Sequence, residues 1–539
     1  MNNIEIAQHF ALLADLMELH GENPFKIKSY TFAARHLKNI DESLSGLSIE
    51  ELEEIEGVGK AIAAKIFHLC KTGKLDLLEK YLSVTPPGVV ELLKIKGIGP
   101  KKIAQLWKEL DIESIGELEY ACNENRLITL KGFGAKTQEN ILQQIQFINQ
   151  SSNKFLWASL EELANDILHE LQQKHPDFPV STCGDFRRKE IVLERVDFLV
   201  GNENPSIQQE IIRKYKQYPV HFSFCTKNTF YLKLLELSSA AEHFSFLSYK
   251  VDTTKSYHSE KAIYDAAGYS FIPPELRDNR IEWAMAERGE MDQLVQLTDI
   301  KGIVHAHSVY SDGSNTLKEM AGYCKEQGFE YLVISDHSKS AFYADGMQEE
   351  KILKQHQEIE RLNKELTPFR IFKSIESDIL NDGSLDYSND VLQSFDLIIA
   401  SVHSQLRMNE EKAMHRLIKA IENPYTTILG HLTGRLLLSR QGYPVDHKKI
   451  IDACAANNVC IELNANPYRL DIDYSWIQYC QEKNVLVSVN PDAHNLRGIH
   501  DIQYGIHAAR KGGLLKDFTL NALTKDNFEK YLKNKNQPS

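Results

Sequence analysis

Seven short apolar runs, rich in β-branched residues, follow one another between residues 300 and 500, and amphipathic segments with helical periodicity separate them. Strands that alternate with helices build parallel sheets, because two parallel strands need a long crossover connection. Seven such units in succession predict a parallel sheet closed into a barrel-like α/β domain. The runs are GIVHAHS, YLVISDHS, FKSIESDI, DLIIASVHS, TTILGHLTG, VCIELNANP and VLVSVNPDAH.

Histidines and carboxylates stand at the carboxyl ends of all but one of these runs, where a parallel barrel builds its active site. Side chains at positions i and i+2 of a strand share a face, so His305 with His307, and Asp492 with His494, can each clamp one cation. Any single one of these residues is equally well explained as a turn cap or a satisfied core histidine. Burying nine of them without metal would leave clustered polar groups poorly paired, so the pattern favours a multinuclear metal site. The nine are His305, His307, Asp312, His337, Glu376, His403, His431, Asp492 and His494.

Three similar glycine-containing turns occur in the first 150 residues, in LEEIEGVGKAIAAKI, LLKIKGIGPKKIAQL and LITLKGFGAKTQENI. In each, an apolar helix end meets a hydrophobic-Gly-x-Gly turn, and the next helix can present its free N–H groups to a phosphate. A single copy of this motif is more simply explained as a tight turn between two helices that binds no ligand. Three copies resemble helix-hairpin-helix elements, which grip the DNA backbone without reading its sequence. The predicted DNA contacts are Gly57, Gly59, Lys60, Gly97, Gly99, Lys101, Lys102, Gly132, Gly134 and Lys136.

The net charge of the chain is −13, so DNA binding must use local patches or backbone groups and not a general positive field. No apolar run is long enough to cross a bilayer, and the N-terminus lacks the basic start of a signal peptide, which predicts a cytoplasmic protein. The eight cysteines include no Cys-x-x-Cys pair and are expected to be reduced thiols.

The seven C-terminal runs resemble the successive motifs of the polymerase and histidinol phosphatase (PHP) domain. The whole chain resembles a bacterial family X DNA polymerase that carries such a domain, and NPFKIKSYTFAARHL and PPELR are similar to further segments of that family. The resemblance implies up to three divalent metal ions (Mn, Zn or Fe), with Glu376 bridging the first two. It groups the ligands as His305, His307, Glu376 and Asp492; Glu376, His403 and His431; and Asp312, His337 and His494.

Three further residues acquire roles from the same resemblance. Arg435 and Arg469 would orient the phosphate through paired hydrogen bonds. Lys65 matches the Schiff-base lysine of the family's lyase domain, although a contact to a 5′-phosphate is the simpler role. Leu432 replaces a proline that usually follows the histidine, which should shift a turn and not a ligand.

The stretch CGDFRRKEIVLERVDFLVG, residues 183–201, resembles the palm of a nucleotidyltransferase with part of its chemistry missing. Only Asp197 remains of the family's metal-binding aspartates, because Arg195 stands at the first position and the neighbouring strand offers His221 or Ser223. Asp185 replaces the serine that would bind a triphosphate. The palm residues considered are Gly184, Asp185, Arg187, Arg188, Arg195 and Asp197.

Arg195 and Asp197 share a strand face, so the sequence predicts an ion pair in the metal's place and a palm retained as a scaffold. The rival interpretation is weak polymerisation through a carboxylate set that uses Glu194 or Asp185. Glu194 would face the other side of the strand.

The expected architecture is multidomain, α+β and α/β, with a C-terminal (β/α)7 barrel. The expected domains are 1–85 (eight-kilodalton-like, helix-hairpin-helix), 86–150 (fingers with two helix-hairpin-helix motifs), 151–225 (degenerate palm), 226–290 (thumb) and 300–539 (PHP). The expected function is DNA repair by metal-dependent phosphodiester hydrolysis at gapped, nicked or primer-template ends, as a 3′–5′ exonuclease, with abasic-site or 3′-end processing included. Three alternatives remain open: an active gap-filling polymerase with exonuclease, a phosphoesterase acting on small molecules, and a purely DNA-binding scaffold, which would explain the hairpins but not the complete ligand set.

Overall fold

The computed structural model describes residues 1–37, 40, 43–55, 58–95, 97–128, 130–149 and 154–535. The chain forms two compact units: residues 1–123 with 127–151, and residues 124–126 with 152–539. Among the described residues, no helix is both long enough and apolar enough to cross a membrane. All eight cysteines are free thiols.

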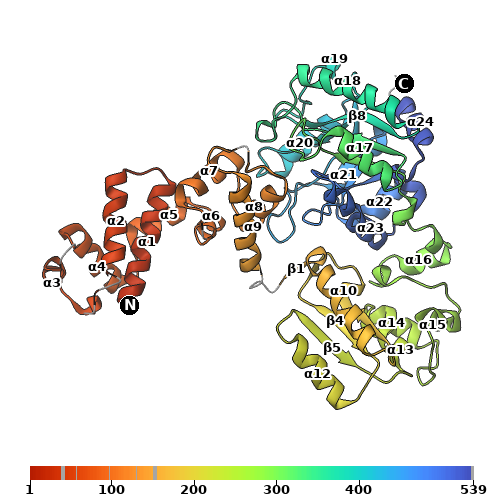
Figure 1. The fold of residues 1–539 in the computed structure, drawn as a ribbon, viewed down its shortest axis with the longest axis horizontal. Coiled ribbons are helices and arrows are strands. Elements are labelled where there is room, and N and C mark those ends of the chain that lie inside the picture. Colours follow the sequence, from red (N-terminus) through yellow and green to blue (C-terminus); the bar gives the residue numbers. More distant parts are fainter. Residues whose placement is uncertain are drawn as a thin grey trace. The chain divides into compact units, whose positions relative to one another are not determined.

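The smaller unit is helical, and its core runs continuously from Ile6 to Ile145. The predicted hairpin turns recur with the same hydrogen bond, from the N–H of Val58, Ile98 and Phe133 to the carbonyl three residues earlier. Its helices are α1 (Asn3–Leu19), α2 (Pro24–Leu37), α3 (Ile49–Glu53), α4 (Lys60–Thr72), α5 (Asp76–Val84), α6 (Pro87–Leu92), α7 (Pro100–Leu110), α8 (Ile115–Asn123) and α9 (Ala135–Asn149) (Figure 1).

The larger unit begins with a small three-stranded sheet in the order β2-β4-β5, in which β4 pairs antiparallel with β2 and parallel with β5. Phe198 and Phe222 stack within its core at 5.2 Å between ring centroids. The elements are β1 (Phe155–Leu156), α10 (Trp157–Lys174), β2 (Val180–Cys183), α11 (Gly184–Arg187), β3 (Val192–Leu193), β4 (Val196–Val200), α12 (Pro205–Tyr215) and β5 (Val220–Phe224); four helices follow, α13 (Phe230–Leu237), α14 (Ala241–Ser248), α15 (Glu260–Ala267) and α16 (Glu282–Glu287).

The predicted barrel follows as a seven-stranded parallel sheet whose strands pair in chain order from β6 to β12. The sheet is nearly closed, because the Ala493 carbonyl accepts from the His307 N–H at 2.8 Å next to the start of the sheet. The strands are β6 (Gly302–Ala306), β7 (Tyr331–Ile334), β8 (Arg370–Asp378), β9 (Leu397–Ser401), β10 (Thr426–Leu429), β11 (Cys460–Asn464) and β12 (Val487–Asn490).

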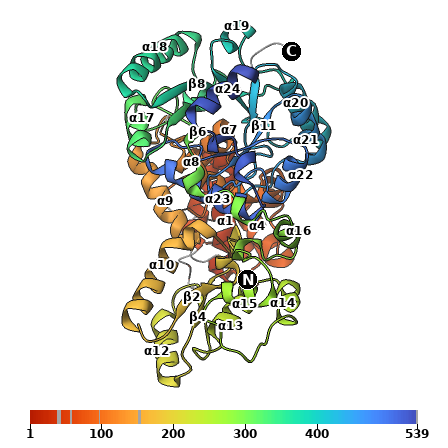
Figure 2. The same ribbon diagram turned by 90° about the vertical axis from the view of Figure 1, so that its right-hand side faces the viewer.

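Helices surround these strands, as Figure 2 shows for β8 and β11. Phe528 and Leu532 of the last helix pack against residues of six strands, among them Val304 and Ile428. The barrel interior is therefore filled, as in other parallel barrels, and the strand ends that carry the polar residues form a separate polar layer. The helices are α17 (Leu317–Glu326), α18 (Glu349–Leu366), α19 (Asn389–Leu392), α20 (Glu410–Ile421), α21 (His447–Ala456), α22 (Ile477–Glu482), α23 (Ile502–Lys511) and α24 (Lys525–Lys535).

Candidate metal centre

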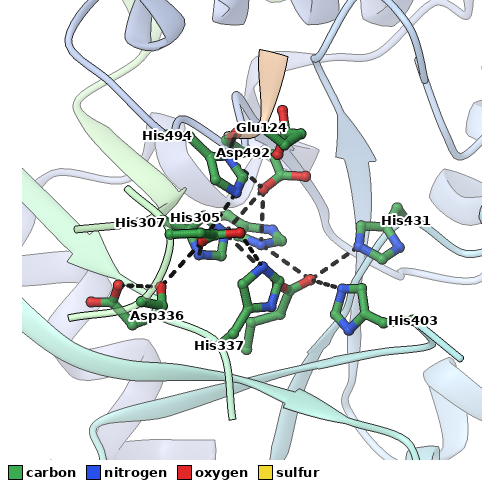
Figure 3. Close-up of polar contacts among 12 residues, drawn as sticks. Glu124, His305, His307, Asp336, His337, His403, His431, Asp492 and His494 are labelled. Carbon is green, nitrogen blue, oxygen red and sulfur yellow. Dashed lines mark hydrogen bonds and ion pairs between the residues drawn. The ribbon is translucent and has the colours of Figure 1, made fainter. Parts of the chain in front are cut away.

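The nine predicted ligands come together at the carboxyl ends of the barrel strands (Figure 3). The chain turns sharply at two of them, because His305 and Asp492 adopt positive φ values of 65° and 53°. Non-glycine residues in this region carry a local energetic cost that the surrounding fold must hold in place. At His305 the register between β6 and β7 also shifts, which lets the strand redirect its side chains toward the centre.

Glu376 lies in the middle of the cluster, at the end of β8. Its Oε1 is 3.0 Å from Nε2 of both His403 and His431 and 3.3 Å from Nε2 of His305. Its Oε2 is 2.9 Å from Nδ1 of His337 and 3.7 Å from Nε2 of His307. One carboxylate thus faces five imidazoles, which is the position expected for a group that bridges cations.

The cluster divides into overlapping groups that could each hold one ion. The predicted trio of Asp312, His337 and His494 is present with His307 added, and His305 groups with His307 and Asp492. His403 groups with Glu376 and His337, whereas the resemblance paired it with His431. The membership of the nine is therefore reproduced as a spatial cluster, and the division among ions stays a prediction.

Several possible metal-binding atoms in this cluster are buried and form no hydrogen bond of normal geometry within the described part of the chain, although some lie at ion-pair distance from a neighbour, as Glu376 Oε2 does from His337 Nδ1. They are His305 Nε2, His307 Nδ1, both ring nitrogens of His337, His431 Nδ1, His494 Nε2, Asp312 Oδ2 and Glu376 Oε2. A buried polar atom without a partner costs about 1–3 kcal/mol, so such a concentration is unfavourable unless another group satisfies it. Divalent cations bind imidazole nitrogens and carboxylate oxygens, so the residues present fit a metal cluster.

Charges within the cluster set its protonation. Burial alone would raise the pKa values of Glu376 and Asp492, but the neighbouring imidazoles hold both well below their usual range. Burial, together with His494 and His337, lowers the pKa of His307 to about 3. Burial alone would lower the pKa values of His305, His337, His403 and His494, but the neighbouring carboxylates outweigh burial and raise all four, so a cation that binds these rings must displace their protons.

Two carboxylates that were not among the predicted ligands orient the histidines. Glu462 accepts from Nδ1 of His305 at 2.6 Å, and Asp378 accepts from Nδ1 of His403 at 2.5 Å. Each bond fixes the ring so that Nε2 points to the centre, as is common for metal-binding histidines. Asp336 holds the loop that carries Asp312, accepting from the Ser308 N–H at 2.8 Å.

Glu124 is a further residue that the sequence analysis did not identify. Its Oε2 lies 2.8 Å from Nδ1 of His494, and it forms a possible ligand group with His494 and Asp492. No spacing rule connects this residue to the barrel, because 181 positions separate it from His305.

Of the two arginines predicted to orient the phosphate, Arg469 lies beside the cluster, whereas Arg435 is bonded to a loop. Nε of Arg469 lies 3.9 Å from Oδ2 of Asp492, at the edge of the cluster. Arg435 donates to the Arg469 carbonyl at 2.9 Å, to the Leu470 carbonyl and to Asp473 at 2.8 Å. Arg435 thus stabilises the loop that carries Arg469, and a direct contact to phosphate stays a prediction for both.

Residues 183–201, predicted to be a degenerate palm, contain the predicted ion pair, with Nε of Arg195 donating to Oδ1 of Asp197 at 3.0 Å. His221 lies opposite Asp197 in the β4–β5 register. A Cβ on Gly184 would approach Oδ2 of Asp197 to 3.1 Å, so little space remains beside this carboxylate. Glu194 is exposed just before β4.

Carboxylates also bind the two neighbouring arginines of this segment, Arg187 and Arg188. Arg187 donates to Glu260 at 3.0 Å through Nη1, and Arg277 binds the same carboxylate at 2.6 Å. Arg188 donates to Asp185 at 2.6 Å and to Asp278 at 3.1 Å. These guanidinium groups are held by internal ion pairs.

The described glycines of the hairpin turns all have open space where a side chain would lie. A Cβ on Gly59, Gly97, Gly99, Gly132 or Gly134 would meet no atom within 4 Å. Positive φ values of 93° and 89° require glycine at Gly97 and Gly132, but Gly59 and Gly99 have ordinary φ values of −76° and −84°. Gly59 and Gly99 are the N-cap residues of α4 and α7, a position where glycine is common, and the open space beside them leaves room for a ligand to approach the backbone. Gly57 lies outside the described residues.

The predicted lysines lie in the first turns of the helices after the hairpins. Lys60 begins α4, Lys101 and Lys102 follow Pro100 at the start of α7, and Lys136 is the second residue of α9. Lys65 lies one turn further along α4, and its Nζ donates to the Ala61 carbonyl at 3.3 Å.

Comparisons with known proteins agree with these features. Residues 1–75 match the family described as Helix-hairpin-helix domain, residues 89–146 match SAM-like Helix-hairpin-helix tandem, and residues 304–466 match PHP domain. The chain is 33% identical over 571 residues to the "DNA polymerase/3'-5' exonuclease PolX" of Bacillus subtilis (strain 168), a match covering 99% of this chain and 100% of the relative.

Shorter relatives match the barrel region. A "Probable phosphatase" of Thermoanaerobacter sp. (strain X514) is 24% identical over 242 residues, covering 43% of this chain and 94% of the relative. A "Probable phosphatase" of Shewanella frigidimarina (strain NCIMB 400) is 25% identical over 169 residues, covering 31% and 63%. The parallel barrel and its buried cluster of histidines and carboxylates define a PHP-domain protein. The agreement over the full length is more specific: the chain belongs to the bacterial family X DNA polymerases with a C-terminal PHP domain.

Proposed function

We propose that this chain is a DNA-repair nuclease whose PHP domain hydrolyses phosphodiester bonds in the 3′–5′ direction, on a polymerase framework that no longer polymerises. The observation that carries the proposal is the contrast between two sites. Nine imidazoles and carboxylates converge in the barrel, and seven of them have a buried atom without a hydrogen bond within the described part of the chain, whereas an arginine neutralises the last palm aspartate. The Bacillus subtilis relative carries both activities in its name.

The residues of the centre have separate tasks in this reaction. Bound Mn, Zn or Fe ions, up to three, would supply hydroxide near neutral pH and neutralise the phosphate oxygens. Glu376 holds the ligand sets together, while Glu462 and Asp378 keep His305 and His403 in the orientation that binds metal. Arg469, beside Asp492, orients the scissile phosphate at the edge of the cluster.

The palm supports the second half of the proposal. Two-metal phosphoryl transfer needs several converging carboxylates. Asp197 is engaged by Arg195, Asp185 by Arg188, and Glu194 lies exposed outside the strand. Arg187 and Arg188, which a triphosphate would need, are bound to carboxylates instead.

A primer-extension experiment tests both halves on one sample. The substrate is a labelled primer on a gapped template, with manganese, with and without the four deoxynucleotides, for the wild-type protein and Asp492→Ala. We expect the wild type to shorten the primer and the variant neither to shorten nor to extend it. Extension by Asp492→Ala would show that the palm is active and would reject the silent-palm half; unchanged shortening would place the nuclease outside the barrel.

A phosphoesterase acting on small molecules is a second candidate, because a probable phosphatase matches the barrel over 94% of its own length. A small-molecule substrate would not explain the presence of three helix-hairpin-helix motifs. Competition separates the two: gapped DNA should inhibit hydrolysis of bis(p-nitrophenyl) phosphate at micromolar or lower concentration if DNA is the substrate.

The hairpins are proposed to hold the DNA backbone through helix N-termini, with Lys65 near a 5′-phosphate. We expect Gly99→Leu to weaken binding of gapped DNA by about tenfold, the value of roughly one charge-assisted hydrogen bond, equally for all sequences. The matched control is Gly46→Leu, because Gly46 is also exposed in the same unit with no atom within 4 Å of an added Cβ. Equal affinities for the two variants, measured by fluorescence anisotropy, would contradict a DNA contact at this hairpin.

A further inference from the structure

A cavity of about 330 Å³ lies among the segments that follow β10 and β11. These segments also carry groups of the metal centre, because the lining residue Thr433 comes two positions after His431 and the lining residue Asp471 comes two positions after Arg469. Arg469 in turn lies 3.9 Å from Asp492. The cavity is therefore lined by the loops that also carry groups of the cluster, and it is large enough to be a ligand pocket.

Two aromatic side chains form one wall of this cavity. The rings of His447 and Trp476 stack with centroids 4.7 Å apart and an angle of 5° between their planes. Both side chains are partly exposed. Burial lowers the pKa of His447, so the imidazole is neutral near pH 7 and the stacked pair, in which each ring covers one face of the other, carries no charge. Such a surface is suited to stacking of a planar ring.

A buried hydrogen-bond acceptor lines the same cavity. Asp471 is fully buried, and its Oδ2 accepts from the N–H of Thr433 at 2.8 Å and from the Thr433 hydroxyl at 3.0 Å. Its Oδ1 has no hydrogen-bond partner among the residues that the structure describes. A carboxylate oxygen left in this state is unfavourable, and a donor on a ligand would relieve it.

The charge of the cavity limits what can bind there. Glu410, Asp471 and Asp473 all line it, and the Arg435 guanidinium is already bonded to Asp473 and to two carbonyls. A phosphate would meet repulsion, whereas a neutral ring with an amino group would find a stacking surface and an acceptor.

We propose that this cavity binds the nucleobase of the DNA end whose phosphate lies at the metal centre, with a preference for bases that carry an exocyclic amine. Adenine, cytosine and guanine can donate from that amine to Asp471, while thymine presents a carbonyl oxygen that the carboxylate repels. This inference rests on the proposed nuclease function and names its nucleotide subsite.

Binding of mononucleotides tests the subsite without requiring DNA cleavage. The manganese-loaded full-length protein is titrated calorimetrically with dCMP, dTMP and deoxyribose 5-phosphate, which has the phosphate and sugar but no base. We expect dCMP to bind about tenfold more tightly than deoxyribose 5-phosphate, in the range of stacking on an aromatic side chain, and severalfold more tightly than dTMP.

Three variants test which residues cause the preference for dCMP. Trp476→Ala should abolish the advantage of dCMP over deoxyribose 5-phosphate, and Trp476→Phe should retain most of it. Asp471→Asn should reduce the difference between dCMP and dTMP. Metal content and thermal unfolding, measured in parallel, show whether each variant is folded.

The outcomes separate this inference from the proposed function. Equal binding of all three compounds, or a base preference that Trp476→Ala and Asp471→Asn leave unchanged, overturns the base pocket even if DNA is cut. Base-dependent binding that these variants remove, in a protein that does not cut DNA, supports the pocket and rejects the exonuclease.

Discussion

Replacing Glu376 with glutamine should lower kcat/KM for DNA hydrolysis by about a thousandfold or more, which corresponds to roughly 4 kcal/mol of transition-state stabilisation. The substitution keeps the size of the side chain and removes the negative charge that faces five imidazoles. The amide also places an N–H₂ group against ring nitrogens, where a cation would otherwise be bound by the carboxylate. Cleavage of a 5′-labelled gapped substrate and metal analysis of the purified protein measure the two effects.

The control for this substitution is Glu326→Gln, which makes the same change on an exposed residue of α17. It should leave both activity and metal content unchanged. If Glu376→Gln retained its full metal content and activity within about tenfold of the wild type, Glu376 would not be the bridging ligand and the centre would have to be built around other carboxylates.

The barrel and its ligand set follow from the sequence because both depend on local rules. Alternation of strands with helices fixes the parallel sheet, and the carboxyl ends of parallel strands meet at one edge, so His403 and Asp492 could be assigned to one site although 89 residues separate them. The pair of Arg195 and Asp197 follows from the two-residue period of an extended chain in the same way, although Arg195 directly precedes β4 and is not part of it.

The residues that the sequence did not reveal act across the fold. Glu462 lies within β11, among mainly apolar residues, so no local pattern marks it as a partner of the metal ligands. Its contact with His305 joins residues that are 157 positions apart in the sequence. The partners of the palm arginines, Glu260 and Asp278, are 73 and 90 residues distant. No periodicity connects such positions, because each contact forms only after segments distant in the sequence have folded against each other.

Substitution of Lys511 by methionine is expected to destabilise the larger unit by about 3 kcal/mol, the lower part of the range for removing one partner of a buried ion pair. Lys511 ends α23, its side chain is fully buried, and its Nζ lies 2.5 Å from Asp278 and 2.8 Å from Glu190. Methionine fills a similar volume but leaves both carboxylates without this cation. The melting temperature should fall by roughly 4 °C.

The matched control is Lys483→Met, which removes a lysine from an exposed ion pair with Asp452 at 2.9 Å in the same domain. Exposed pairs contribute about 0–1 kcal/mol, so its melting temperature should change little. Equal small shifts for both variants would show that the carboxylates around Lys511 are satisfied without it.

The Lys511 cluster gives Arg188 a structural role that does not depend on polymerisation. Arg188 binds Asp278, the same carboxylate that Lys511 binds, and Lys511 also contacts the Arg188 carbonyl at 3.3 Å. The palm is thereby joined to a helix of the barrel through charges that are costly to separate. If Arg188 now serves to connect these two parts of the chain, Arg188→Met should lower the melting temperature as Lys511→Met does. The double variant should lose less stability than the sum of the two single losses, because both cations stabilise the carboxylate of Asp278.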